Sequence, residues 1–246
     1  MTIKNKVLAG FNRGAKTYDQ AARLQAKIAD RLAAKLTGIS AQQILEVGCG
    51  TGLLSQHLVT QFPQADLLLT DISPAMIEKC RLRLADLPNI KLACVDGEVL
   101  IDLPTFDLIT SSMTLHWFKE LESSLRYMQQ KLRKGGRLVF AMLTENSLPE
   151  WRNICHQFAY PVSTPPFPAM TALRENFAEL KFTIETIKEV YSNAHDFLNT
   201  LKLLGAVAPR AGYVPLTPGK MRTILRHFNS EIEITYEVVY GEYCYL

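Results

Sequence analysis

The stretch ILEVGCGTGLL, residues 44 to 54, places three glycines directly behind a short apolar run. The run QILEV (43–47) predicts a buried strand, and GLLSQHLVTQF (52–62) predicts a helix. Glycines at the end of a buried strand let the backbone come close to a ligand. The first question is whether that ligand carries a phosphate.

The spacing of the glycines argues against a phosphate. Gly48, Gly50 and Gly52 form the pattern GxGxG, whereas a dinucleotide-binding turn reads GxGxxG. The Gly-Lys-Ser/Thr ending of a Walker loop is absent from this loop. Glu46 lies two residues before the first glycine, where a carboxylate is a poor neighbour for a pyrophosphate. It is a reasonable neighbour for a cation such as an α-ammonium group.

Two further acids follow the next two predicted strands. Asp71 ends the run ADLLLTD (65–71), and a carboxylate there can accept hydrogen bonds from both hydroxyls of a ribose. Asp96 and Gly97 follow the run IKLACVD (90–96), in a position to meet an adenine amino group. Each acid alone could simply cap a helix. Their order after successive strands indicates a nucleoside site.

The wider pattern alternates strands with helices, which predicts a parallel sheet with helices on both faces. Ser73 and Pro74 form a clear helix start, with a capping side chain followed by proline. We expect helices over 17–36, 52–62, 73–87 and 121–133, and strands over 43–47, 65–71, 90–96, 106–112 and 137–143.

The regular alternation of one strand with one helix stops after Leu143. We expect helices over 148–160, 170–180, 194–206 and 217–229, and strands over 181–191 and 231–246. Two late strands separated by helices fit an antiparallel edge on a parallel sheet. The sequence predicts a single domain over 1–246, with an N-terminal helical cap (1–38), a cofactor-binding core (39–145) and a C-terminal part (146–246) that carries inserted substrate-lid helices.

The amino-acid composition limits the kinds of protein that this chain can be. The 246 residues are 48% hydrophobic and 21% charged, which is ordinary for a globular chain. No run of ~20 apolar residues and no secretory signal is present, so we expect no membrane association and a cytoplasmic protein. The five cysteines show no CxxC spacing, which favours buried, reduced thiols. The histidines show no metal-ligand spacing, so we expect no metal.

The charge distribution says more than the net charge of +3. Residues 1–18 hold four basic side chains and no acid, and residues 197–230 hold five basic side chains and no acid. These side chains are Lys4, Lys6, Arg13 and Lys16, and Lys202, Arg210, Lys220, Arg222 and Arg226. Either they form one face that meets a negative partner, or they are solvated residues on several faces.

The ordered motifs resemble those of the class I S-adenosylmethionine-dependent methyltransferases. The resemblance covers 43–143 through ILEVGCGTG, LTDIS, VDGE, FDLITSS and LRKGGRLVFAM. It implies a Rossmann-like α/β fold with a mostly parallel seven-stranded sheet and an antiparallel C-terminal strand. It also implies S-adenosyl-L-methionine as cofactor. The implied binding residues are Glu46 for the amino-acid end, Gly48, Cys49, Gly50 and Gly52 for the methionine part, Asp71 for the ribose, Ile72 and Met76 for the adenine faces, Asp96 and Gly97 for the adenine amino group, and Ser111 near the methyl group.

The segments outside the core resemble one family within that class, the malonyl-acyl carrier protein O-methyltransferases of biotin synthesis. The similarity lies in VLAGFNRGAKTYDQAARLQAKIADRLAAKL, SSMTLHWFKELESSLRYMQQKLRKGG and DFLNTLKLLGA. The chain departs from the family pattern in AVAPRAG, after LLG. The resemblance implies methylation of the free carboxylate of a malonyl group carried on acyl carrier protein, which the acid-free segments would meet.

An ionised carboxylate attacks a sulfonium methyl group without a general base, so alignment and desolvation carry the catalysis. Arg210 is the first candidate for the cation that holds this carboxylate, and Arg13 or Lys16 the second. Tyr18 either closes over the site or is a core aromatic of its helix. His116, next to Trp117, lines the substrate pocket either as a buried, satisfied histidine or as a catalytic base.

Four other functions remain open on the sequence. The acceptor is a free small carboxylic acid of the aconitate kind, or a carbon atom of a quinone precursor, which would need His116 as a base. A non-catalytic cofactor-binding partner is a third possibility, which the intact motifs disfavour. RNA methylation is the fourth, but no aromatic-rich basic segment is present, so we expect no nucleic acid partner.

Overall fold

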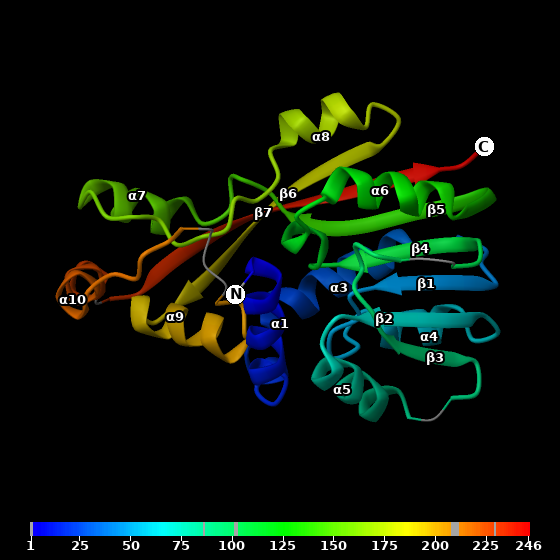
Figure 1. The fold of residues 1–246 in the computed structure, drawn as a ribbon, viewed down its shortest axis with the longest axis horizontal. Coiled ribbons are helices and arrows are strands. Elements are labelled where there is room, and N and C mark those ends of the chain that lie inside the picture. Colours follow the sequence, from blue (N-terminus) through cyan, green and yellow to red (C-terminus); the bar gives the residue numbers. More distant parts are fainter. Residues whose placement is uncertain (1, 86, 101–102, 208–211, 229) are drawn as a thin grey trace.

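The computed structural model describes residues 2–85, 87–100, 103–207, 212–228 and 230–246, and a seven-stranded sheet runs through it (Figure 1). The strand order is β3-β2-β1-β4-β5-β7-β6. The strands are β1 (Gln43–Val47), β2 (Asp66–Asp71), β3 (Ile90–Cys94), β4 (Phe106–Ser112), β5 (Leu132–Leu143), β6 (Lys181–Tyr191) and β7 (Ile232–Cys244). Strand β7 pairs antiparallel with both β5 and β6, and the other pairs are parallel. The predicted Rossmann-like α/β fold with an antiparallel C-terminal strand is therefore confirmed.

Helices cover both faces of this sheet. They are α1 (Ile3–Gly14), α2 (Tyr18–Ala21), α3 (Arg23–Lys35), α4 (Ser55–Gln61), α5 (Pro74–Leu84), the short 3-10 helix η1 (Leu115–Trp117), α6 (Leu121–Gln130), α7 (Pro149–Gln157), α8 (Met170–Asn176), α9 (Ala194–Leu203) and α10 (Pro218–His227). Successive residues of β1 point to opposite faces, because side chains alternate along a strand. Ile44 packs in the hydrophobic cluster of α3 to α5, and Leu45 packs in the cluster of α6 and α8.

The start of α5 follows the sequence prediction closely. The hydroxyl of Ser73 accepts a hydrogen bond from the backbone N–H of Met76 at 3.2 Å, and Pro74 occupies the first helical position. A capping side chain satisfies a donor that the helix itself leaves free. The helix start is thereby placed directly after β2, next to the glycine loop.

Several predicted elements end a few residues away from the observed ones, and two predictions differ from the structure by more than their ends. The helix expected over 17–36 is interrupted at Ala22 (φ −83°, ψ 34°) and forms α2 and α3. Contacts outside the helix hold the first piece, since Thr17 Oγ1 donates to the carbonyl of Leu203 at 2.8 Å. Strand β5 begins at Leu132, inside the predicted helix 121–133, because Leu132 pairs with Phe106 ahead of an irregularity in the register.

The C-terminal part extends the sheet away from the core. In Figure 1, α7, α9 and α10 gather at one end of β6 and β7, and α1 lies between this group and the core strands. Helix α1 meets the segment after α9 backbone to backbone: a Cβ atom built on Gly10 would lie 2.3 Å from the carbonyl oxygen of Gly205. The N-terminal cap is thus joined to the C-terminal part as well as to the core.

The predicted state of the cysteines is only partly right. Cys49, Cys80 and Cys155 are buried, whereas Cys94 and Cys244 are exposed, so burial of all five was a wrong expectation. Cys94 and Cys244 are each the last residue of a strand, β3 and β7. In the described part of the chain, no helix is both long enough and apolar enough to cross a bilayer.

The Gly10 contact predicts an unusual response to alanine. A glycine-to-alanine change inside a helix normally stabilises by about 0.5–1 kcal/mol. Gly10→Ala should instead destabilise the protein by about 1–3 kcal/mol, because backbone atoms of Gly205 occupy the space of the new methyl group. Urea unfolding, with limited proteolysis of the N-terminal segment, measures the effect.

Gly219→Ala is the matched control, since Gly219 also lies in a helix, with no atom within 4 Å of its built Cβ. It should leave stability unchanged or raised. A Gly10→Ala protein as stable as the Gly219→Ala protein would contradict the packing argument.

Candidate active site

The glycine loop after β1 is held in place by the end of β2 and by the segment that follows β4. The backbone N–H groups of Gly48 and Cys49 both donate to the carbonyl of Thr70, at 2.7 and 2.8 Å. Gly48 has φ 75°, and a Cβ atom there would lie 2.2 Å from Oγ1 of Thr114. Only glycine fits at that position. Gly50 faces open space and lines a cavity of about 100 Å³.

Asp71 ties this loop to the start of α5. Its Oδ2 accepts the N–H of Gly50 at 2.9 Å, and its Oδ1 accepts the N–H of Ser73 at 2.8 Å. Burial raises the pKa of this carboxyl, while the two backbone donors act in the opposite direction. Each oxygen has a second lone pair, so the side chain can still accept hydrogen bonds from two hydroxyls of a ligand.

Glu46 is buried beneath the loop at 1% exposure. Its Oε2 accepts the hydroxyl of Ser55 at 2.6 Å, and burial raises its pKa to about 8. Among the residues that the structure describes, no lysine or arginine pairs with it. A buried carboxyl without a cation is stable only when it is neutral, and a ligand ammonium would supply the missing charge.

The adenine-side residues lie where helix α1 crosses the cavity. Lys4 of α1 reaches Asp96 at 2.7 Å and Glu98 at 2.5 Å. A Cβ on Gly97 would lie 2.6 Å from the ring of Phe118, so only glycine lets this segment pack there. Ile72, Met76, Asp96 and Gly97 all line the cavity, as do Glu46, Gly48, Cys49, Gly50 and Asp71.

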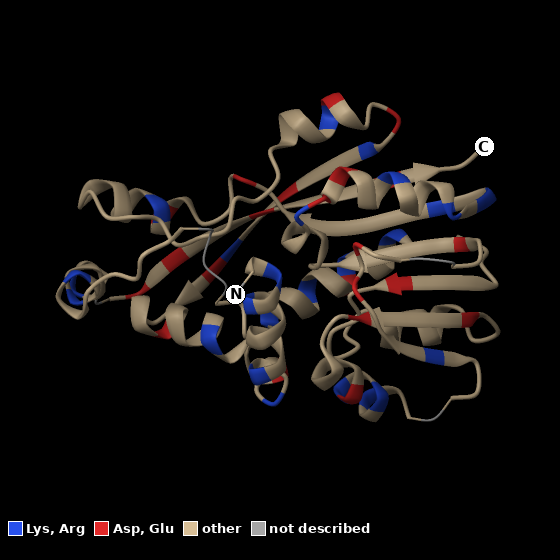
Figure 2. Cartoon of the chain, viewed as in Figure 1, with Lys and Arg blue, Asp and Glu red and all other residues tan. Residues whose placement is uncertain are grey.

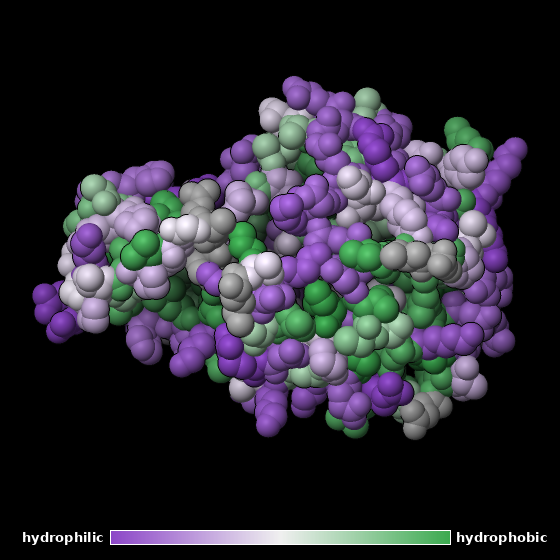
Figure 3. Space-filling model, in the orientation of Figure 1, coloured by the Kyte–Doolittle hydropathy of each residue, from purple (hydrophilic) through white to green (hydrophobic). Residues whose placement is uncertain are grey.

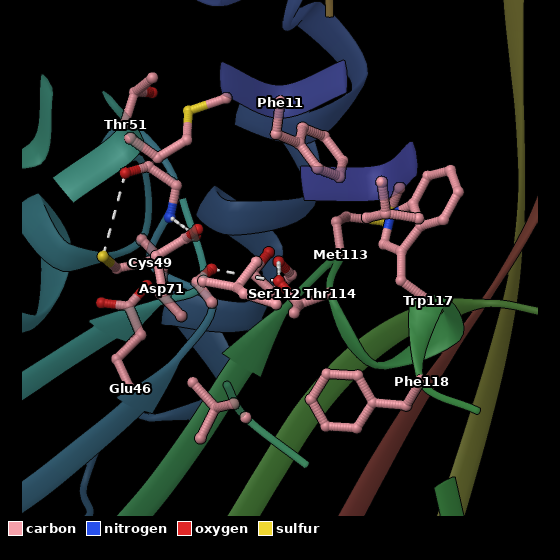
Figure 4. Close-up of a pocket in the computed structure, with 18 of the residues that line it drawn as sticks. Phe11, Glu46, Cys49, Thr51, Asp71, Ser112, Met113, Thr114, Trp117 and Phe118 are labelled. Atoms are coloured by element: carbon pink, nitrogen blue, oxygen red, sulfur yellow. Dashed lines mark hydrogen bonds between the residues drawn. The ribbon is translucent and has the colours of Figure 1, made fainter. Parts of the chain in front are cut away.

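Of these residues, Figure 4 labels Glu46, Cys49 and Asp71, which lie close together beside the glycine loop. Gly52 is the exception among the predicted glycines: it packs against Cys80 of α5, at 3.1 Å from its built Cβ, and is outside the described lining. It therefore supports the loop from behind.

The expected place of Ser111 is corrected by one residue. Ser111 is fully buried and donates its hydroxyl to the carbonyl of Val47 at 2.7 Å, whereas Ser112 lines the cavity. Neighbouring strand residues point to opposite faces, so a shift of one position moves a side chain out of the site. The sequence of this strand ends in two adjacent serines, and it does not show which of the two faces the cavity.

A second, larger cavity of about 390 Å³ adjoins the first on the side of the C-terminal part. Its lining is mostly apolar and aromatic, from α1 to α3, η1, α7, α9, β6, β7 and the segment 163–167. On the face in Figure 3, hydrophobic residues come to the surface in the middle of the molecule, within a largely hydrophilic border. Five side chains line both cavities: Phe11, Tyr18, Gln25, Met113 and Trp117.

Tyr18 and His116, predicted from sequence, both line the larger cavity. Burial and the nearby charge of Asp71 raise the pKa of Tyr18 well above its usual value, so its hydroxyl is a neutral donor. Burial lowers the pKa of His116 to about 3, and Nδ1 accepts a long hydrogen bond of 3.5 Å from the N–H of Leu143. His116 is therefore a neutral ring at physiological pH.

Arg210 lies outside the described residues. Within the described lining of the larger cavity, Arg23 is the one lysine or arginine, and it is exposed. The one carboxylate of that described lining, Glu189, is near Lys27 at 3.8 Å. Sequence reasoning missed Arg23 because it is an ordinary surface arginine by pattern. Its position two residues after Ala21, at the start of α3, gives it access to the cavity.

A bridge of polar contacts holds α2, and so Tyr18, over the glycine loop. Asp19 accepts the hydroxyl of Thr51 at 2.7 Å and an N–H of Arg83 at 2.7 Å. The Nε–H of Arg83 also donates to the carbonyl of Thr51 at 2.7 Å. On the far side, Asn12 of α1 accepts the hydroxyl of Ser73 at 2.7 Å. The cap thus rests on the same loop and helix start that form the cavity.

These groups fit S-adenosylmethionine in their chemistry. Glu46 is a buried carboxyl that lacks a cation, and Asp71 has unused lone pairs next to an open backbone at Gly50. Within the described part of the chain, no group of three or more His, Cys, Asp or Glu side chains is arranged to hold a metal ion.

Comparisons with known proteins agree with this architecture. The family profile of a methyltransferase domain matches residues 45–138. The YcgJ protein of Bacillus subtilis superposes with a TM-score of 0.62 at 14% identity, over 89% of this chain and 97% of that one. The N-methyltransferase NodS of Bradyrhizobium japonicum, in complex with S-adenosyl-L-homocysteine, gives a TM-score of 0.52 at 15% identity, over 92% and 87%. These two structures support the fold.

A sequence relative narrows the family. The malonyl-acyl carrier protein O-methyltransferase of Magnetococcus marinus is 35% identical over 236 residues, which covers 92% of this chain and 87% of the relative. The similarity includes the cap and the C-terminal part as well as the core. The chain is a methyltransferase, and it belongs to the family of malonyl-acyl carrier protein O-methyltransferases.

Proposed function

We propose that the protein methylates the free carboxylate of a malonyl thioester on acyl carrier protein, with S-adenosylmethionine as the methyl donor. The observation that carries the proposal is the junction of the two cavities, where a cofactor site with acidic side chains meets a larger, mostly apolar cavity. Such a junction brings a cationic donor and an organic acceptor together in a space with little water.

The binding roles follow from the contacts of each side chain. Glu46 would pair with the α-ammonium group and Asp71 would accept the ribose hydroxyls. Ile72 and Met76 would cover the adenine, and Asp96 with Gly97 would meet its amino group. When bound, S-adenosylmethionine supplies a methyl group on a positively charged sulfur.

The state of His116 favours a carboxylate over a carbon acceptor. Transfer to carbon needs a base, and a histidine with a pKa of about 3 is a weak one. An ionised carboxylate brings its own nucleophilic oxygen and loses no proton in the reaction. The work left to the chain is to orient that oxygen and exclude water. Arg23 would attract the carboxylate from the exposed edge of the cavity.

The basic segments support a protein-bound substrate. Helix α1 touches the turn after α9, so the first acid-free segment adjoins the α9 part of the second, and α10 lies farther out along the same end of the molecule (Figure 2). We call the exposed cations of the two segments, taken together, the basic surface: Lys6, Arg13, Lys16, Lys202, Lys220, Arg222 and Arg226. Within the described residues, none of these seven has an acidic partner within 4.0 Å. Acyl carrier proteins are acidic, so this surface would complement one. A cytoplasmic setting follows from the same proposal.

The ribose role of Asp71 predicts a loss of cofactor affinity in Asp71→Ala. One hydrogen bond to a charged acceptor is worth about 1.5–3 kcal/mol, so loss of the ribose contacts should raise the dissociation constant by at least about 10- to 150-fold. Calorimetry with S-adenosylhomocysteine measures it. Asp66→Ala removes an exposed carboxylate from the other end of β2 and should change nothing. Equal affinity of Asp71→Ala and wild type would remove the ribose assignment.

The raised pKa of Glu46 predicts a pH-dependent affinity. The Glu46 carboxyl by itself is protonated below its pKa of about 8, whereas pairing with an ammonium group requires the ionised form. Cofactor affinity should therefore rise by up to tenfold per pH unit from ~6 to ~8, with about one proton released on binding at pH 7. Above pH ~8 it should fall again as the ligand ammonium deprotonates.

Calorimetry in two buffers of different ionisation enthalpy counts the released protons. Glu46→Gln should bind more weakly and release none. A wild-type affinity that is flat between pH 6 and 8 would rule out the ammonium role.

Docking on the basic surface predicts a salt effect. The Debye length shrinks from ~10 Å at 0.1 M to ~3 Å at 1 M salt, so kcat/KM on malonyl-carrier protein should fall as salt rises. Turnover of malonyl-coenzyme A should change less. The double variant Arg222→Ala, Arg226→Ala should lower kcat/KM on the carrier-bound substrate by roughly threefold to tenfold, through slower association.

Lys134→Ala with Arg137→Ala is the control, at exposed cations of β5 far from α10 (Figure 1). Faster turnover of a free dicarboxylic acid, without a salt effect, would favour the small-acid alternative. A base-stable product methylated on carbon would favour the quinone-precursor alternative.

A further inference from the structure

The junction of the two cavities has a small and distinctive set of walls. Phe11, Tyr18, Gln25, Met113 and Trp117 are its five described members. Figure 4 shows Phe11, Met113 and Trp117 next to one another at this point, and the rings of Phe11 and Trp117 meet edge to face at 5.6 Å. Donor and acceptor atoms must approach to about 3–3.5 Å for transfer, so they must meet between these walls.

The side-chain amide of Gln25 is unsatisfied at this place. Its Oε1 is buried and has no hydrogen-bond partner among the described residues. The other two such atoms in that part of the chain belong to His57 and Thr110, which line neither cavity. Buried polar groups in proteins are nearly always paired, so a ligand group is the expected partner. Rotation of the amide can turn its N–H groups into the same position.

Two other residues that line both cavities carry neutral donors. Tyr18 contributes a hydroxyl and Trp117 an indole N–H, and neither forms a hydrogen bond with another described residue. The three groups come from separate elements, α2, α3 and η1. Met113 lies beside them with φ 56°, a conformation that residues other than glycine rarely adopt and that is common at functional sites.

The break at Ala22 is what brings Gln25 to this position. Helix α3 begins at Arg23, and its first turn, with Arg23, Leu24 and Gln25, forms one wall of the larger cavity. Ala22 provides no side-chain cap for this turn. The positive end of the helix therefore adds to the preference for an anion in front of Gln25. An unbroken helix over 17–36 would have placed residue 25 in a helix interior.

We propose that Gln25 is a catalytic residue whose amide N–H, with the indole N–H of Trp117 and the hydroxyl of Tyr18, holds the acceptor carboxylate at the junction. The proposal rests on the proposed function only in taking the acceptor to be a carboxylate. Neutral donors orient a carboxylate and leave its charge on the oxygens. A buried cation in the same place would weaken the attacking oxygen as a nucleophile. Arg23, at the exposed edge, attracts the group without covering it.

The test separates the carboxylate from the rest of the substrate. Malonyl-carrier protein and acetyl-carrier protein share the thioester and the carrier, but only the first has the carboxylate. Calorimetry measures the affinity of each for protein saturated with S-adenosylhomocysteine. Gln25→Leu should weaken malonyl-carrier binding about 10- to 100-fold and leave acetyl-carrier binding unchanged. Gln25→Glu, which brings a second carboxylate, should weaken it more.

Matched variants keep the result interpretable. Gln20→Glu makes the same charge change at an exposed position of α2 and should bind both carrier proteins as wild type does. Trp117→Phe removes the N–H while keeping an aromatic ring and should shift affinity in the same direction as Gln25→Leu. The S-adenosylhomocysteine affinity of each variant is measured first, so that every variant is saturated, because Gln25 and Trp117 line both cavities.

Two results would overturn the proposal. One is wild-type affinity of Gln25→Leu for malonyl-carrier protein, and the other is an equal loss for malonyl and acetyl forms. If wild type does not methylate malonyl-carrier protein but methylates a free dicarboxylic acid, the proposed function fails by itself. The same variants are then compared on that acid and its neutral amide: a loss restricted to the acid supports Gln25, and an equal loss overturns it.

Discussion

The carboxylate of Asp71 is the contact on which the site depends. It accepts the backbone N–H of Gly50 from the loop and the backbone N–H of Ser73 from the start of α5. Ser73 in turn caps α5 and donates its hydroxyl to Asn12 of the N-terminal cap. One half-buried side chain therefore sets the relative positions of the loop, the helix behind it and the cap above it. A shift of this carboxylate would be felt in all three, because backbone hydrogen bonds leave little freedom.

The two cavities differ in the charge of the groups that surround them. The cofactor side holds two carboxyls, the buried Glu46 and the half-buried Asp71, and loss of solvation raises the pKa of both. The acceptor side presents neutral donors, an exposed arginine and an outer surface of cations. Opposite charges are thus drawn to opposite sides of one junction, and each ligand is disfavoured in the other's place. The sign of the charge on each ligand therefore selects its side of the junction, independently of the fit of its shape.

Much of the core could be predicted from sequence because its signals are local. The strand runs, the cap at Ser73 and the acids after each strand depend on neighbours in the chain. Other features depend on distant contacts. The break at Ala22 follows from partners in the glycine loop and at the end of α9, and the register of β5 follows from its pairing with Phe106. Ser111 and Ser112 differ only in which face of a strand they occupy. No sequence motif marks Gln25, because the lack of a hydrogen-bond partner for its Oε1 becomes visible only in the folded structure.

The contact between Gly10 and Gly205 limits how this scaffold can be altered. A methyl group on either residue would meet backbone of the other, each at 2.3 Å from a carbonyl oxygen. The first helix and the turn after α9 are therefore one mechanical unit, although they come from opposite ends of the chain. A chimera that exchanges only the C-terminal half for that of another enzyme would lose the backbone surface against which its first helix packs. Exchange of acceptor specificity between such proteins requires both segments to be transplanted together, as a matched pair.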